Sequence, residues 1–292
     1  MISPTLPVYN IEDFRILNQE EHFYVSGLSA HLKQFCFIHK PHKHDFYFCV
    51  LCTKGSGTHE IDFNTYDVTP GSVFTIAPGQ AHTWKLSPDI EGYVFFHTGS
   101  FYDMHFTVER VKNYPFYCSV NNSSLILLKN EQKDKVEFIF KEILQEDGHD
   151  HLMKYQKLRS LLSSLYIELS RAYLPQKMTA AQNHGYLIKV RRLEELIDTY
   201  FKKMKSPGEY AGLMFMSEKH LNRICKDCLN KTVSELISDR IILEAKRLLL
   251  YADHSVAEVS AELGYFDHSY FSRMFKKKCG QTPVQFINRY HE

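Results

Sequence analysis

The sequence predicts an α+β protein of two domains, a β-rich domain followed by an all-α domain. Two observations lead to this prediction. The hydrophobic pattern changes at about residue 130, from short apolar or alternating runs to helical spacing. Near the C-terminus one stretch of helical pattern occurs twice, which is typical of two similar units. A chain of 292 residues is long enough for two domains, each with its own core.

The first 120 residues are expected to form the short strands of a barrel or a sandwich. Apolar or alternating runs are separated here by turns rich in glycine and proline, which is the pattern of such sheets. The runs lie at 46–51, 59–63, 72–76 and 92–97, and the turns lie at 54–57, 69–71 and 77–79.

Two helices are expected to flank this β structure. Apolar residues recur at intervals of three and four from Val136 to Leu144, and again from Leu158 to Leu169. The second run holds more leucine than one flank of a barrel needs. Residues 155–172 are therefore predicted to form a dimer interface that includes Leu161 and Leu165.

A linker is expected at residues 175–186, because this stretch is polar and is bounded by proline and glycine. It divides the chain into a first domain at 1–174 and a second domain at 187–292.

The second domain contains the repeat. Residues 217–237 align without a gap onto residues 267–287, at an offset of 50. Apolar residues match at six positions, and the match extends upstream through Ala211/Ala261 and Leu213/Leu263. A short helix, a turn and a second helix, present twice, predict two helix-turn-helix units.

Helix boundaries in the two units follow from capping residues. Ser217 and Asp267 are good N-caps for the second helix of each unit, and Asn230 and Gly280 suit its C-terminal end. The first helix of each unit is expected at about 208–213 and 256–263, with Gly264 in the second turn, a linking helix from Val233 to about Leu250, and a last helix from Pro283.

In a helix-turn-helix the second helix lies in the major groove, where its exposed early residues meet base edges. Arginine suits guanine and asparagine suits adenine. The lysines at 276–278 end the second recognition helix where a phosphate backbone would run, so Lys276 and Lys277 are predicted phosphate contacts.

The distribution of charge along the chain agrees with DNA contacts in the second domain. The net charge is only +1, but residues 185–292 hold 18 basic and 14 acidic residues, against 17 and 20 in residues 1–184. The seven cysteines show no disulfide framework, which favours reduced thiols in the cytoplasm. We expect no signal peptide and no membrane span, since the required apolar runs are missing.

The segment GYFDHSYFSRMFKKKCGQTPVQF, residues 264–286, resembles the C-terminal signature of the AraC/XylS family of bacterial transcription regulators. The resemblance covers about residues 190–290 and implies two helix-turn-helix subdomains on one rigid helix. It implies base-reading roles for Lys219, His220, Asn222 and Arg223 in the first unit, and for His268, Ser269, Tyr270, Ser272 and Arg273 in the second. In the first unit Cys225, Asn230 and Val233 stand where the family usually has Phe, Gly and Pro.

Histidines gather in the first domain, at His39, His42 and His44 before one strand and at His82 after a turn. Residues 35–97 resemble the cupin-type sensor domain of the same family, which implies a cupin-like β-barrel. Three converging imidazoles can bind a metal ion, but metal-binding cupins also supply a Glu where this chain has Phe48 or Cys49. Two further roles stay open, as polar groups within the barrel or as the lining of an effector site formed by His42, His44, Tyr47, His82 and Trp84.

These observations predict a sequence-specific transcription regulator that responds to a small-molecule effector, with activation the commoner mode in the resembling family. The expected partners are double-stranded DNA, the effector and a second copy of the chain, with RNA polymerase as a further candidate and no membrane. We expect no cofactor and no enzymatic activity. Two alternatives remain, a cupin metalloenzyme with a DNA-binding tail and a constitutive DNA-binding dimer that takes no ligand.

Overall fold

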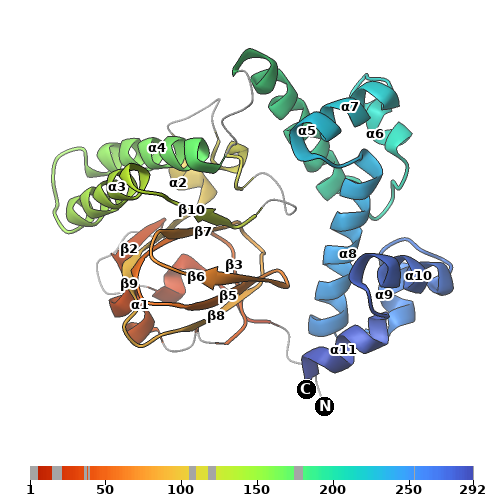
Figure 1. Cartoon of the computed structure of the whole chain (residues 1–292), viewed down its shortest axis with the longest axis horizontal. Helices are drawn as coiled ribbons and strands as arrows, with labels where there is room; N and C mark the ends of the chain where they lie inside the picture. The colour runs from red at the N-terminus through yellow and green to blue at the C-terminus, as the bar shows by residue number, and fades with distance from the viewer. Residues whose placement is uncertain are drawn as a thin grey trace. The chain divides into compact units, whose positions relative to one another are not determined.

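The computed structural model describes residues 6–14, 22–35, 38, 40–104, 110–117, 123–173, 180–252 and 254–291 (Figure 1). Its internal contacts divide it into two compact units, one built from the described residues up to 173 and one from those that begin at 180. His39, Cys36 and Cys118 lie outside the described residues, as does the first part of the expected linker, and from Ala180 onward that linker segment is helical.

The N-terminal unit contains two antiparallel sheets and one short parallel pair of strands. The main sheet has the strand order β10-β7-β4-β9-β2, from strands β2 (Phe23–Gly27), β4 (Tyr47–Lys54), β7 (Ser72–Ile76), β9 (Glu91–His97) and β10 (Leu125–Leu127). A second sheet has the order β6-β5-β8, from β5 (Gly57–Ile61), β6 (Asn64–Val68) and β8 (His82–Leu86). A short parallel pair joins β1 (Val8–Tyr9) to β3 (Lys43–His44).

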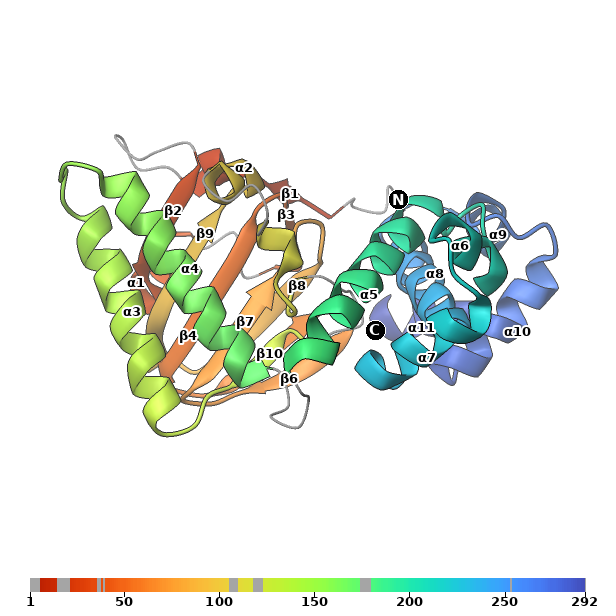
Figure 2. The ribbon, with the colours of Figure 1, turned by 90° about the horizontal axis from the view of Figure 1, so that it is seen from above.

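Both faces of the main sheet are buried, and β4 shows how. Phe48, Val50 and Cys52 belong to the core between the two sheets. Cys49 and Leu51, which alternate with them, belong to a second core against α3 (Glu131–Asp147) and α4 (Lys154–Tyr173). Figure 2 shows these two helices lying across the sheet. Burial on both faces explains why this strand is a continuous apolar run.

The prediction of a β-rich domain with flanking helices is confirmed, whereas a closed barrel is not seen among the described strands. β2 and β10 form the edges of the main sheet and each pairs with one neighbour, so the second sheet stacks on the main sheet instead of continuing it. The helices cover the outer face of the main sheet, which leaves three layers.

The leucine-rich helix α4 has a different use from the one expected. Leu165 is 0% exposed, and Leu158, Leu162 and Leu169 are likewise buried in the core that α4 shares with α3 and the main sheet. Leu161 is half-buried against the same core. The leucines of α4 therefore pack within the domain, and their number does not indicate a dimer interface on this helix.

Short helices complete the first unit. These are α1 (Leu28–Gln34) and α2 (Gly99–Asp103), with single 3-10 turns at Ile11–Phe14 and Val111–Asn113.

The C-terminal unit is all helical, and the prediction of two helix-turn-helix units within it is confirmed. The helices are α5 (Ala180–Tyr200), α6 (Pro207–Leu213), α7 (Glu218–Leu229), α8 (Val233–Tyr251), α9 (Val256–Glu262), α10 (His268–Cys279) and α11 (Pro283–His291). Among the described residues, no helix is both long and apolar enough to cross a membrane.

The predicted caps also hold. Ser217 Oγ accepts from His220 N, and Asp267 accepts from the backbone of Ser269 and Tyr270. Asn230 and Gly280 end the recognition helices in the left-handed conformation, at φ 54° and 75°. Three capping boxes, which the sequence analysis did not use, start α6, α8 and α9 at Ser206/Glu209, Thr232/Glu235 and Ser255/Glu258.

The repeat is not uniform in offset, which corrects its upstream extension. The recognition helices α7 and α10 match at an offset of 50, but the N-caps of α6 and α9, Ser206 and Ser255, lie 49 residues apart. Leu213 is half-exposed while Leu263 is fully buried, so these two are not equivalent. The turn of the second helix-turn-helix unit is one residue longer than that of the first. Tyr265, Phe266 and Asp267 stand there where the first has only Met216 and Ser217.

Candidate DNA-binding surface and ligand site

The second recognition helix exposes most of its predicted base-reading residues. His268, Ser269 and Tyr270 are exposed in its first turn, and Arg273 follows on the exposed side, while Ser272 is half-buried. The opposite side is anchored by Phe271 and Phe275, which are both fully buried. Arg273 lies 4.0 Å from the capping carboxylate of Asp267, with both side chains largely exposed. An exposed ion pair of this kind is weak and leaves the guanidinium available.

The first recognition helix exposes fewer of its predicted base-reading residues. Lys219 and Arg223 are exposed, but His220 and Asn222 are half-buried. Arg223 Nη2 lies 3.0 Å from His220 Nδ1, which would accept the bond as the unprotonated ring nitrogen. The side chains of Arg223 and His220 therefore form a hydrogen-bonded pair on the surface.

Asn222 has a structural partner that the sequence analysis did not foresee. Its Oδ1 accepts from the backbone N–H of Val233, the first residue of α8, at 3.0 Å. The corresponding residue of the second unit is Pro283, which has no N–H and needs no acceptor. The bond to Val233 holds the orientation of the Asn222 amide, whose oxygen keeps a second lone pair.

The lysines that end the second recognition helix divide by role. Lys276 and Lys277 are exposed at the helix end, as the predicted phosphate contacts require. Lys278 instead donates to Asp239 of α8 at 2.8 Å.

In the N-terminal β-rich unit, four of the five predicted effector-site residues come together between the two sheets. The rings of His42 and His44 lie 4.3 Å and 5.0 Å from that of His82, and Trp84 lies 5.6 Å from His82. All four are buried.

Tyr47 is the exception, and its predicted place in this site is wrong. It precedes Phe48 on β4, and neighbouring residues of a strand point to opposite faces. Phe48 packs against His82, whereas the Tyr47 ring packs on His97 and Tyr117 at the helix-covered face.

A fourth histidine, His59, belongs to the cluster and was missed. It lies on β5 opposite Trp84 of β8, and its Nε2 is 3.0 Å from His82 Nδ1. The alternation of His59 with Ile61 on a strand next to His82 is the signal that would have found it.

Burial holds these imidazoles neutral. Desolvation lowers the pKa of His44 and of His59 from 6.5 to about 3, with the neighbouring histidines adding to the effect. The pKa values of His42 and His82 are lowered by burial as well. Four buried ring atoms have no hydrogen-bond partner within the described part of the chain, namely His44 Nε2, His59 Nδ1, His82 Nε2 and Trp84 Nε1.

The described residues contain no group of three or more metal-ligating side chains arranged to hold an ion. At the positions where a metal cupin has Glu, Phe48 lies in the core between the sheets and Cys49 points to the other face. A surface pocket of about 570 Å³ borders the same region, between α1 and the end of β8, and includes Trp84, Lys33 and Lys85 in its lining.

Two family models match the chain, one in each unit of the fold. Residues 210–289 match a helix-turn-helix domain, and residues 22–100 match an AraC-like ligand binding domain. Similar curated proteins include the HTH-type transcriptional activator RhaR of Yersinia pestis, 21% identical over 85% of this chain and 84% of its own length. The RhaR protein of Enterobacter sp. strain 638 is 23% identical over 86% of this chain and 88% of its own length.

Solved structures with some likeness include fatty acid-bound ToxT of Vibrio cholerae, 15% identical over 93% of this chain and 97% of that chain, with a TM-score of 0.43. The C-terminal domain of AraT from Geobacillus stearothermophilus is 27% identical over 35% of this chain and 84% of that chain, with a TM-score of 0.33. Scores below 0.5 are too low to support an argument.

Proposed function

This chain belongs to the AraC family of DNA-binding transcription regulators, and we propose that it reads two DNA boxes, one with each recognition helix, under the control of a small neutral ligand. The observation that carries the proposal is the placement of two capped recognition helices, α7 and α10, on one continuous helix α8. Such an arrangement suits two successive major grooves, which lie ~34 Å apart.

The direction of control is proposed as activation, because the curated relatives named above are transcriptional activators. We further propose that the protein acts as a homodimer in the cytoplasm, engages RNA polymerase and performs no enzymatic step. Sedimentation of the full chain tests the dimer.

The first test is in vitro selection of the full-length protein against random duplex DNA. Enrichment of two short boxes about one helical turn apart is the expected result. Enrichment of a single box would restrict base reading to one unit. No enrichment by the full chain and by residues 187–292 alone would overturn the proposal, whereas enrichment by the fragment alone would show that the first domain represses binding.

Arg273 is proposed to read a base of the second box. Arg273→Ala is then expected to weaken binding to the selected site by about 1–3 kcal/mol, with less effect on unrelated duplexes. Lys277→Ala is the matched control, because loss of a phosphate contact weakens binding to all sequences and lowers the salt dependence by about one charge. Equal weakening by Arg273→Ala on every duplex would make Arg273 a phosphate contact.

The chemistry of the ligand follows from the unpartnered atoms of the histidine cluster. His44 Nδ1 lies 3.1 Å from the carbonyl oxygen of Phe46, so Nδ1 carries the hydrogen and Nε2 is an acceptor. Trp84 Nε1 is a donor only. In the bonded pair His59–His82, the two outer nitrogens are one donor and one acceptor, whichever ring donates to the other.

The cluster therefore presents two donors and two acceptors. A hydroxyl group donates and accepts, so a neutral polyhydroxyl compound can satisfy all four atoms. A carboxylate would leave the two acceptors without a donor, and a metal ion would leave Trp84 without an acceptor. Leaving a buried polar group unsatisfied costs about 1–3 kcal/mol, which is enough to discriminate between these classes.

We expect neutral monosaccharides or polyols, screened as a panel, to raise the melting temperature of the protein. A ligand at a hundred times its Kd adds about 2.7 kcal/mol to the stability of the folded state. The corresponding sugar acids and Zn²⁺ are the controls and should give no shift. Trp84→Phe, which keeps the ring and removes the N–H, should weaken the response to the neutral compound. Stabilisation by the acids or by the metal alone would contradict the assigned ligand class.

A further inference from the structure

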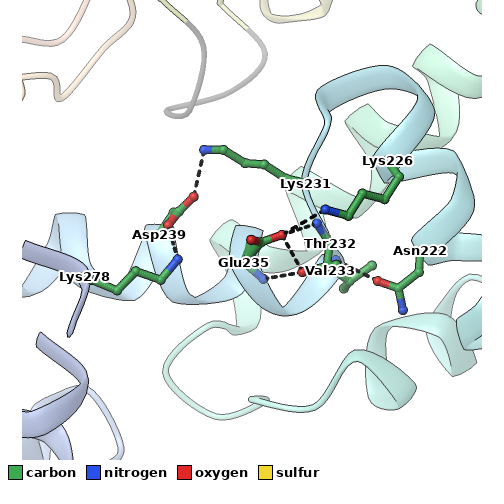
Figure 3. A network of polar contacts seen from close by, with 8 residues as sticks. All are labelled: Asn222, Lys226, Lys231, Thr232, Val233, Glu235, Asp239 and Lys278. Atoms are coloured by element: carbon green, nitrogen blue, oxygen red, sulfur yellow. Dashed lines mark hydrogen bonds and ion pairs between the residues drawn. The ribbon is translucent and has the colours of Figure 1, made fainter.

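One carboxylate on the linking helix holds a lysine from each helix-turn-helix unit. Asp239 Oδ2 accepts from Lys231 Nζ at 2.8 Å, and Asp239 Oδ1 accepts from Lys278 Nζ at 2.8 Å (Figure 3). Lys231 follows the C-cap of α7, and Lys278 lies in the last turn of α10. The ends of both recognition helices are thus tied to the same side chain.

A second carboxylate extends this network along the same face of α8. Glu235 lies one turn before Asp239, and residues four apart are neighbours on a helix surface. Hydrogen bonds from the backbone and side chain of Thr232 lower the pKa of Glu235 to about 2, and the charges of Lys226 and Lys278 add to the effect. Lys226 of α7 lies 3.7 Å from Glu235 (Figure 3). The first two turns of α8 therefore meet cations from both α7 and α10.

The contribution of this network to the free energy of unfolding is small. The side chains of Asp239, Lys231 and Lys278 are 22%, 36% and 30% exposed, and ion pairs as exposed as these stabilise a fold weakly. A shared carboxylate also restrains the rotation of each recognition helix about α8. Helix α8 has 19 residues, which at ~1.5 Å per residue span ~28 Å. A small rotation at one end therefore displaces the far recognition helix relative to its groove.

We propose that Asp239 is a positioning residue that sets which spacing between the two DNA boxes the protein accepts. The inference rests on the proposed reading of two boxes by α7 and α10. Asp239 acts through Lys231 and Lys278 and touches no base. Its loss frees the two units to rotate, so that the protein tolerates boxes placed one or two base pairs away from the preferred spacing.

The test compares Asp239→Asn with the wild-type chain on duplexes that carry the selected boxes at the preferred spacing and at one or two base pairs more or less. The expected result is a loss of spacing selectivity: the ratio of Kd at the shifted spacing to Kd at the preferred spacing falls about threefold or more. Lys278→Gln should act in the same direction, and the double variant should be no less selective than Asp239→Asn alone.

Asp227→Asn is the matched control, since it removes one exposed carboxylate from α7. Losing a negative charge near DNA strengthens binding at all spacings, so its selectivity ratio should equal that of the wild type. A melting temperature measured for each variant separates altered spacing from lost folding.

An Asp239→Asn protein that is folded and as spacing-selective as the wild type would overturn the role of Asp239 and leave the two-box proposal standing. A wild-type protein with no spacing preference would overturn both.

Discussion

Acidification from about pH 7 to about pH 5 is expected to unfold the N-terminal domain. Burial lowers the pKa of His31, His44 and His59 from 6.5 to about 3, and that of His97 to about 4. The unfolded chain takes up these protons below pH 6.5, while the folded domain cannot. The stability that the neutral rings provide is therefore complete above pH 6.5 and is lost as the pH falls toward their folded-state pKa values.

The size of this effect exceeds that of a single core substitution. Each such group removes about 1.4 kcal/mol of stability per pH unit within this window. At about pH 5 the four groups together remove several kcal/mol, which is comparable with the 5–15 kcal/mol that stabilises a typical domain.

Fluorescence of Trp84 measures this transition in the first domain alone, because the chain has a single tryptophan and it packs against the histidine cluster. His44→Asn is the matched variant, since its amide can still donate to the carbonyl of Phe46 but does not titrate. Its stability should depend on pH less steeply than that of the wild type, by about one proton. An acid midpoint that is unchanged in this variant would exclude His44 from the transition.

Gly264→Ala is expected to disrupt the second helix-turn-helix unit. Gly264 has φ +80°, and a Cβ at this position would lie 2.1 Å from the backbone oxygen of Lys202. Neither backbone can move freely, because Lys205 Nζ donates to Leu263 O at 2.6 Å and to Lys202 O at 3.1 Å. We expect a loss of more than about 3 kcal/mol in the free energy of unfolding of this unit, from strain and displaced packing together.

Gly280→Ala is the control for this prediction. Gly280 has a similar φ of +75°, but nothing lies within 4 Å of its added Cβ. The left-handed conformation alone should cost about 1 kcal/mol. Urea unfolding followed by circular dichroism measures both variants, and DNA binding should be lost only for Gly264→Ala. Equal losses for the two glycines would attribute the effect to φ and remove the role of the Lys202 contact.

The first helix-turn-helix unit supports this distinction between the cost of the left-handed conformation and the cost of the close contact. Phe215 occupies the place equivalent to Gly264, at φ +54°, and its side chain is 98% exposed. A residue with a side chain is therefore tolerated at this turn when the turn is open to solvent.

Much of the second domain was predictable because its signals are local. A helix N-cap, a left-handed C-cap and an apolar stripe each depend on residues within a few positions of one another. Ser217, Asp267, Asn230 and Gly280 accordingly bound the recognition helices where they were expected. The one-residue difference between the two turns escaped detection, because Ala211/Ala261 and Leu213/Leu263 match in sequence without matching in burial.

The boundaries of the two recognition helices, the presence of two domains and the family could be predicted from the sequence, since these depend on short-range patterns. The start of α5 could not, because Ala180 lies within the expected linker. The tertiary structure decides which residues of each strand face which core. It places Tyr47 away from the histidines, brings His59 next to them and buries most leucines of α4 within the domain. It also decided that Asp239 meets lysines 8 and 39 residues away in the sequence. Such pairings follow from how the strands and helices pack, and packing is a property that no short stretch of sequence contains.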